Sequence, residues 1–163
     1  MELVIEHLED VLPHIKPDTG IIHSVHQGYS VINYVFSLDE TFSTPLAREC
    51  RGLKFAPDGT LIARPFHKFF NLGERRPPQE EPWNMSHVVL DKLDGSMIHP
   101  AMVSDEMVFM TRMGMSAQSR QAWNVAPSGV VDLCRDMLAG GIHQSLSSPR
   151  PTIALSLHTT SQP

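Results

Sequence analysis

The chain has 163 residues, a length that suits one domain, and 41% of them are hydrophobic, which is enough for an ordinary packed core. A net charge of −5 argues against nonspecific nucleic-acid binding by the whole surface. No apolar run is long enough to cross a bilayer, and the first residues lack the pattern of a signal peptide. Cys50 and Cys134 form neither a metal-type pair nor a disulfide framework, so we expect a reducing, cytoplasmic setting.

The first part of the chain predicts a short helix followed by a hairpin. Apolar side chains recur on one helical face over residues 2–12, and Pro13 ends the pattern. Two β-rich runs follow at 21–25 and 29–36, and the Gln-Gly pair before the second run, with Gly28, predicts the hairpin turn.

A second hairpin is expected after a loop at residues 37–47. Strand-like runs at 51–55 and 60–64 flank a Pro-Asp-Gly turn at 57–59, which is a strong hairpin signal. The polar segment 73–82, GERRPPQEEP, is the clearest loop of the sequence. We interpret it as a surface loop inside one domain.

The second half predicts more strands, then helices. A β-rich run at 87–92 precedes a hairpin of strands at 96–103 and 106–111, and a last strand-like run covers 152–157.

Two helices are expected between that hairpin and the last strand. Ser116 is a candidate cap for a helix reaching about residue 125, and a second helix follows Pro127 and ends at Gly140. Several apolar residues share the inner face of the second helix: Val130, Val131, Cys134, Met137 and Leu138. Hairpins followed by helices indicate an α+β fold with antiparallel sheets and flanking helices.

Basic residues concentrate in one stretch. Seven of the thirteen Lys and Arg residues fall there: Arg48, Arg51, Lys54, Arg64, Lys68, Arg75 and Arg76. This stretch is the candidate anion-binding region, and a solvated basic surface is the alternative if charge is the only signal.

The sharpest motif is Lys92-Leu93-Asp94-Gly95-Ser96. A lysine at the end of an apolar strand is desolvated, which favours the nucleophilic amine. On a strand Asp94 shares the face of Lys92, and Gly95 lets the backbone approach a ligand closely. Taken by itself, the motif favours a lysine that caps a hairpin turn.

A second feature precedes it in the chain. The segment E-C-R-G, which contains Arg51, leads into a strand, and R-P-F-H-K-F-F-N-L, with Lys68 at its centre, follows. The alternative for Lys68 is a side chain that snorkels over a cluster of core aromatics. We expect those aromatics, Phe66, Phe69 and Phe70, to be mostly core.

Together, E-C-R-G, R-P-x-x-K-F-F-N-L and K-x-D-G-S, in this order and at these spacings, resemble the phage-type RNA ligase 1 family. That family belongs to the covalent nucleotidyltransferase superfamily, and the resemblance runs from the N-terminal hairpin to the helices after residue 115. It implies that residues 1–163 are the N-terminal part of a nucleotidyltransferase (ATP-grasp-like ligase) domain that ends before the C-terminal motifs. Chance matching would require three coincidences in order, so we rank a purely structural domain last.

The resemblance also implies roles for single residues. Lys92 would attack the α-phosphate of ATP and hold AMP, while Arg51 and Lys68 would hold the triphosphate tail. Asp94 and Gly95 of the lysine motif would also bind the nucleotide, as would Arg112, which stands where the family usually has lysine. Mg²⁺ would bridge phosphate oxygens, with protein ligands that the sequence does not assign.

Two departures from the family pattern leave an alternative open. Ser156 stands where an aromatic-Glu-aromatic strand is expected, and the chain ends at Pro163 before the later glutamate and Lys-x-Lys motifs. The first interpretation is a monomeric adenylylation domain that acts on ATP and RNA ends, for example those of cleaved tRNA, without a membrane partner. The alternative is a fragment or relic that binds nucleotide or RNA without turnover.

Nine histidines and two cysteines carry no predicted site. His23 and His26 fall on opposite faces of a strand, and neither His67 nor His99 has a ligand partner in sequence. We expect surface or turn histidines and a small buried side chain at Cys50.

Overall fold

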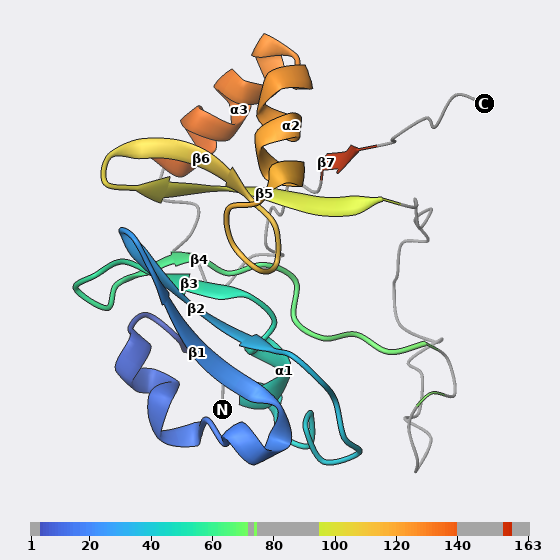
Figure 1. Cartoon of the computed structure of the whole chain (residues 1–163). Coiled ribbons are helices and arrows are strands. Elements are labelled where there is room, and N and C mark those ends of the chain that lie inside the picture. Colours follow the sequence, from blue (N-terminus) through green and yellow to red (C-terminus); the bar gives the residue numbers. More distant parts are fainter. Residues whose placement is uncertain (1–3, 72–73, 75–94, 140–154, 158–163) are drawn as a thin grey trace, which may run out of the picture.

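Four layers stack in the computed structural model, which describes residues 4–71, 74, 95–139 and 155–157 (Figure 1). N-terminal turns and a short helix cover the outer face of a four-stranded sheet. The inner face of that sheet packs on a three-stranded sheet, and two helices cover the far face of the latter. The α+β class with antiparallel sheets and helices is therefore confirmed.

The four-stranded sheet has the order β1-β2-β3-β4 with antiparallel neighbours throughout. It is built from the two predicted hairpins: β1 (Ile21–His26), β2 (Tyr29–Tyr34), β3 (Leu53–Phe55) and β4 (Leu61–Ala63). Strand β2 is buried on both faces, because Ile32 enters the outer core while Val31 enters the core between the sheets.

The helix predicted over residues 2–12 is wrong in the described part of the chain. Two short 3-10 turns, Leu8–Asp10 and Leu12–His14, take its place, and Pro13 lies inside the second turn. The cause is non-local, because Leu61 donates its backbone N–H to the carbonyl of Glu6 at 2.9 Å. The N-terminal segment therefore pairs with β4 instead of forming a helix. A third 3-10 turn, Pro17–Thr19, leads into β1.

A helix that the sequence did not predict, α1 (Pro45–Glu49), begins inside the segment expected to be a loop at 37–47. Its start follows ordinary capping, since the Thr44 hydroxyl accepts the N–H of Ala47 at 3.1 Å. Proline is well placed as the first helical residue because its missing N–H would have no partner there.

The three-stranded sheet has the order β6-β5-β7 and is again antiparallel. Strands β5 (Ser96–Val103) and β6 (Glu106–Met110) form the predicted hairpin, and β7 (Leu155–Leu157) confirms the last strand in its described residues. The strand predicted at 87–92 lies outside the described residues. So does the loop at 73–82, apart from Glu74.

Helices α2 (Ala117–Val125) and α3 (Ser128–Ala139) cover the outer face of this sheet, as predicted. The Ser116 hydroxyl accepts the N–H of Ser119, and the Ser119 hydroxyl accepts the N–H of Ser116 in return. Cys134 of α3 is fully buried in the core that these helices share with β5 and β6. Among the described helices, none combines the length and apolar character needed to cross a membrane.

Candidate functional site

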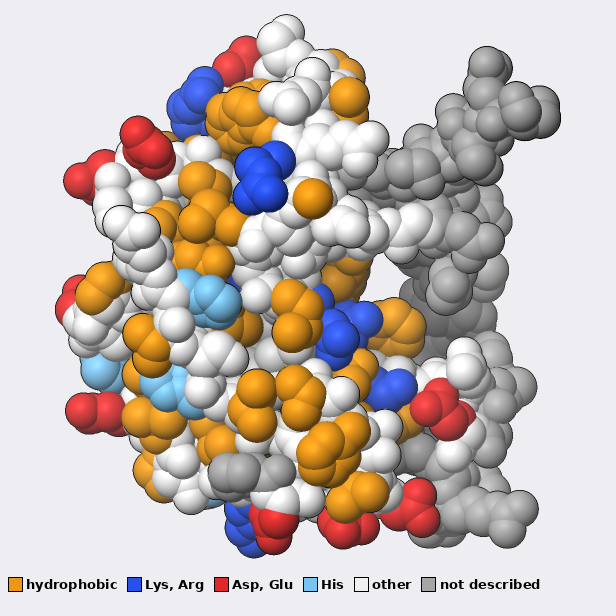
Figure 2. Space-filling view, viewed as in Figure 1, with side chains coloured by type: hydrophobic (Ala, Val, Ile, Leu, Met, Phe, Trp, Pro, Cys, Tyr) orange, Lys and Arg blue, Asp and Glu red, His pale blue; other side chains and the backbone are white. Residues whose placement is uncertain are grey.

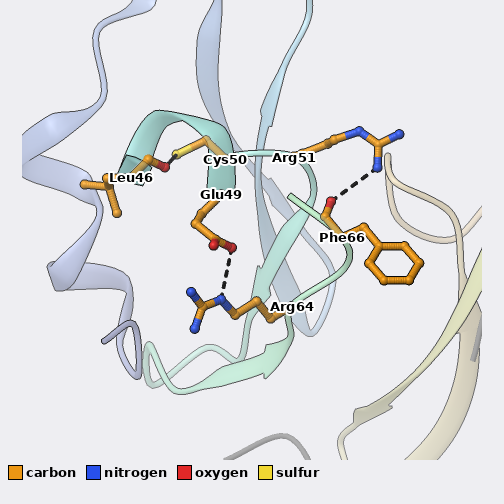
Figure 3. A network of polar contacts seen from close by, with 6 residues as sticks. All are labelled: Leu46, Glu49, Cys50, Arg51, Arg64 and Phe66. Atoms are coloured by element: carbon orange, nitrogen blue, oxygen red, sulfur yellow. Dashed lines mark hydrogen bonds and ion pairs between the residues drawn. The ribbon is translucent and has the colours of Figure 1, made fainter. Parts of the chain in front are cut away.

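Arg51 lies between the end of α1 and the start of β3, where its half-buried side chain meets the segment after β4 (Figure 3). Its Nη1 donates to the carbonyl of Phe66 at 3.2 Å, and its guanidinium carbon lies 5.2 Å from the centre of the Phe69 ring. The cation is therefore held by a carbonyl and a ring.

An ion pair joins the same two segments next to Arg51 (Figure 3). Arg64 Nε lies 3.1 Å from Glu49 Oε2, and the two side chains are only 8% and 10% exposed. Because burial weakens screening by water, this pair fixes the segment after β4 against the end of α1.

Lys68 lies on that segment and is bound at both its backbone and its side chain. Its N–H donates to the carbonyl of Arg48 at 2.8 Å. Its Nζ lies 4.7 Å from the Phe70 ring centre and 5.9 Å from that of Phe42, and it donates to Glu74 at 3.3 Å. The ammonium is thus placed over aromatic faces, where a cation is attracted electrostatically.

The core role predicted for the aromatics around Lys68 is wrong for two of them. Phe69 is 55% exposed and Phe66 is 39% exposed, whereas Phe70 is half-buried. The reason is that β4 ends at Ala63, so these residues run along the surface outside the sheet, where the Phe69 ring contacts Arg51.

Arg112 reaches the same region from the other sheet, in the turn that follows β6. Its guanidinium carbon lies 4.5 Å from the Tyr34 ring centre, and its Nη1 lies 3.4 Å from both the Asn33 side-chain oxygen and the Tyr34 carbonyl. Tyr34 in turn meets Phe42 edge-on at 4.9 Å.

These contacts form one continuous series, which we call the cation–aromatic row: Arg112, Tyr34, Phe42, Lys68 and Phe70. Two cations from sequence-distant segments, one that follows β4 and one that follows β6, are linked through two rings. Figure 2 shows basic side chains lying among hydrophobic ones on this face of the molecule. Such an arrangement suits an anion with an aromatic or apolar portion, because charge and ring faces are offered together.

Lys54 is a residue whose position the sequence did not reveal. It is fully buried, and its Nζ donates to the carbonyls of Gly52 at 2.7 Å, Thr111 at 2.9 Å and Arg112 at 3.3 Å. Burial, and secondarily the charge of Arg112, holds the pKa of Lys54 well below its ordinary value. Its place between two apolar strand residues, Leu53 and Phe55, is the signal that could have indicated burial.

His99 is also buried, at 4% exposure, so the expected surface or turn position is wrong for this histidine. It lies on the face of β5 opposite Ile98, which turns it toward the other sheet. Neither ring nitrogen has a hydrogen-bond partner among the described residues, and burial, followed by the nearby charge of Lys54, lowers the pKa of His99. The described residues hold no cluster of three His, Cys, Asp or Glu side chains suited to a metal ion.

Cys50 is buried, as expected. Its Sγ lies 3.4 Å from the Leu46 carbonyl (Figure 3), and burial, together with the charge of Glu49, raises the pKa of the thiol to about 12. It is therefore an inert packing residue at neutral pH.

Comparison with known proteins places the part of the chain that carries these residues in a known family. A family model described as RNA ligase matches residues 49–140, more than half of the chain. The chain belongs to the phage-type RNA ligase family. The matched range includes Arg51, Lys68, Lys92 and Arg112.

Two relatives are similar to part of the chain. "Putative RNA ligase" of Thermovibrio ammonificans is 43% identical over 83 residues, which is 50% of this chain and 22% of that protein. "RNA ligase 1" of Bacteriophage TS2126 is 35% identical over 97 residues, which is 55% of this chain and 25% of that protein. The aligned region thus covers at most a quarter of either relative.

The structure describes some of the ligase-family residues predicted from sequence. It brings Arg112 and Lys68 into one row and holds Arg51 at the adjoining segment. Gly95 precedes β5 with a φ of +137°, a backbone conformation that glycine readily adopts. Lys92 and Asp94 lie outside the described residues, and their roles remain predictions.

Proposed function

We propose that this chain is an adenylylation domain of an ATP-dependent RNA ligase. The amine of Lys92 attacks the α-phosphorus of ATP, a nitrogen–phosphorus bond forms, and the bond to the bridging oxygen breaks. Pyrophosphate leaves, the attacking nitrogen loses its proton, and AMP remains on the lysine as a phosphoramidate.

The observation that carries the proposal is the cation–aromatic row with Arg51 beside it. Three cations from separate motif segments of the family converge on one region of the fold. Phosphoryl transfer depends mainly on positioning and on fixed positive charge around the transferred and departing groups. Arg51 and Lys68 would hold the departing pyrophosphate, and Arg112 would add charge from the opposite sheet.

In this scheme Mg²⁺ binds together with ATP, as the Mg·ATP complex. Mg²⁺ prefers phosphate oxygens and water over dedicated cages of protein ligands. The chain's own contribution is then to orient the nucleotide tail through Arg51 and Lys68 and to present the amine of Lys92.

The remaining steps of the ligase cycle act on RNA ends. AMP would pass from Lys92 to an RNA 5′-phosphate, and a 3′-hydroxyl would then attack that phosphate, seal the strand and release AMP. Ends of cleaved tRNA are one substrate that fits this chemistry.

Labelling with ATP tests the first step directly. The chain, incubated with Mg²⁺ and ATP labelled at the α-phosphate, should acquire acid-labile label, and Lys92→Ala should abolish it. Lys16→Ala, at an exposed position far along the sequence from the motifs, serves as the matched control and should label normally. Label that persists in Lys92→Ala would remove Lys92 from the mechanism.

A second candidate is a domain that binds nucleotide or RNA without turnover. It is favoured by Ser156, which stands in β7 opposite Met97 of β5, where the family pattern has a glutamate. ATP binding without covalent label in the same experiment would select this candidate.

A further inference from the structure

We propose that Lys54 is a positioning residue, a buried clamp that fixes the turn bearing Arg112 against the backbone next to Arg51. Lys54 belongs to β3 of the four-stranded sheet, and its side chain enters the space between the two sheets. The carbonyls that it contacts belong to both sides of that space. Its proposed effect on nucleotide binding rests on the proposed function, whereas the clamp itself does not.

The hydrogen bonds of Lys54 match the donor capacity of an ammonium group. An ammonium has three N–H donors, and three backbone carbonyls, those of Gly52, Thr111 and Arg112, accept from Nζ. A neutral amine would have only two N–H groups and would place its lone pair against a carbonyl oxygen. The three carbonyls therefore offset much of the desolvation of a buried charge.

The turn held by Lys54 is itself tight. Thr111 and Gly114 exchange two backbone hydrogen bonds of 2.9 and 3.0 Å. From the first sheet, the Tyr29 hydroxyl accepts the N–H of Met115 at 3.0 Å. The turn is thus tied to β3 at its beginning and to β2 at its end.

Close packing reinforces this attachment at Gly52. A Cβ added at Gly52 would lie 2.6 Å from the carbonyl oxygen of Arg112, and the φ of Gly52 is +93°. Only glycine lets the turn approach so closely. Because Gly52 directly follows Arg51, the backbone segments that carry Arg51 and Arg112 meet at this point. Lys54 donates to the carbonyl of Gly52 on one segment and to that of Arg112 on the other.

This arrangement can act on ligand binding through geometry. A polyphosphate bound by cations from separate segments requires a fixed separation between those cations, and an error of about 1 Å in such positioning is costly. A merely structural lysine would affect stability without altering the contribution of Arg112. A positioning lysine makes the contribution of Arg112 depend on residue 54.

A double-mutant cycle separates these roles. Mg·ATP affinity is measured calorimetrically for the wild-type chain, Lys54→Met, Arg112→Ala and the double variant. We expect Arg112→Ala to weaken binding about tenfold in the wild-type background and less than about twofold in Lys54→Met, the signature of coupled residues. The same tenfold loss in both backgrounds would overturn the proposal.

Phe55→Leu is the matched control. Phe55 is the next residue of β3, is equally buried, and packs in the core on the other face of the sheet. In this background Arg112→Ala should still cost about tenfold, because general loosening of β3 leaves the clamp intact. Loss of the Arg112 effect here would show that destabilisation alone explains the result.

Two further measurements test the clamp without ATP, and the first of them needs no variant. In the unmutated chain, nitrogen-15 spectra should contain one lysine ammonium protected from solvent exchange, with a coupling across the hydrogen bond to the Thr111 carbonyl. In Lys54→Met, amide exchange of Gly114 and Met115 should accelerate about tenfold relative to Phe55→Leu at equal global stability. Absence of the protected ammonium, or unchanged exchange, overturns the clamp even if ATP binds. If ATP does not bind the wild-type chain, the proposed function fails and these two measurements still decide on Lys54.

Discussion

Glu49 and Arg64 form an ion pair that is almost completely removed from water and joins two motif segments of the ligase family. Glu49 ends α1, and Arg64 begins the segment that carries Lys68. Together with the hydrogen bonds of Arg51 and Lys68, the pair therefore helps to determine where these two cations lie relative to each other.

Arg64→Met should destabilise the chain by about 3 kcal/mol. The substitution leaves the buried Glu49 carboxylate without its Arg64 partner, and breaking a buried pair from one side is costly. Urea unfolding measures the free energy. The control is Arg135→Met, because Arg135 pairs with Asp132 at 3.0 Å on the exposed surface of α3, and such pairs contribute roughly 0.5 kcal/mol or less. Equal losses for the two variants would contradict the prediction.

His99 should make the fold sensitive to mild acid. Its pKa in the folded chain lies below the ordinary 6.5, because burial and the neighbouring Lys54 charge disfavour the imidazolium. Below pH 6.5 the unfolded chain binds a proton that the folded chain does not, so stability is full above pH 6.5 and falls as pH decreases, by at most about 1.4 kcal/mol per pH unit.

Urea unfolding at pH 7.5 and 5.5 tests this sensitivity. We expect wild type to lose about 1 kcal/mol over this interval and His99→Leu to lose almost none. His14→Leu, at an exposed position, should behave as wild type. Asp10 and Glu74, whose pKa values are lowered by backbone hydrogen bonds, respond below this window, and Lys54, as the ammonium proposed above, keeps its proton across it. A full acid loss in His99→Leu would show that another group is responsible.

Arg112→Lys should lower the rate of AMP labelling about tenfold, even though the family resemblance places a lysine at this position. A lysine ammonium lacks the planar fork that here stacks on Tyr34 while its Nη1 lies near Asn33. Tyr34→Leu should lower the rate about threefold, which corresponds to loss of a cation–π contact of roughly 0.7 kcal/mol. Arg120→Lys, an exposed change on α2, is the control, and a wild-type rate in Arg112→Lys would contradict the prediction.

Local sequence signals predicted the hairpins and the two later helices. The Pro-Asp-Gly turn, the glycine at position 28 and the Ser116 cap act within a few residues. They can therefore be recognised in the sequence without knowledge of the fold. The N-terminal segment could not be predicted in this way, because its hydrogen bonds go to β4, more than fifty residues away.

The candidate site was predictable in its residues but not in its geometry. The family resemblance predicted Arg51, Lys68 and Arg112 as site residues. No local pattern, however, indicates that rings from β2 and from the 37–47 segment link Arg112 to Lys68. The burial of Lys54 likewise depends on carbonyls 57 and 58 residues further along the chain. A lysine within a basic stretch gives no hint of such partners.

The cation–aromatic row has a consequence for how salt affects the binding of a polyphosphate. Lys68 and Arg112 are partly covered by rings, and partly buried charges are shielded by dissolved ions much less than fully hydrated ones. The attraction that they exert on a polyphosphate should therefore persist at ionic strengths that suppress loose, surface-wide binding. This net-acidic chain should therefore bind a nucleotide at high salt concentration, while the rest of its surface repels polyanions.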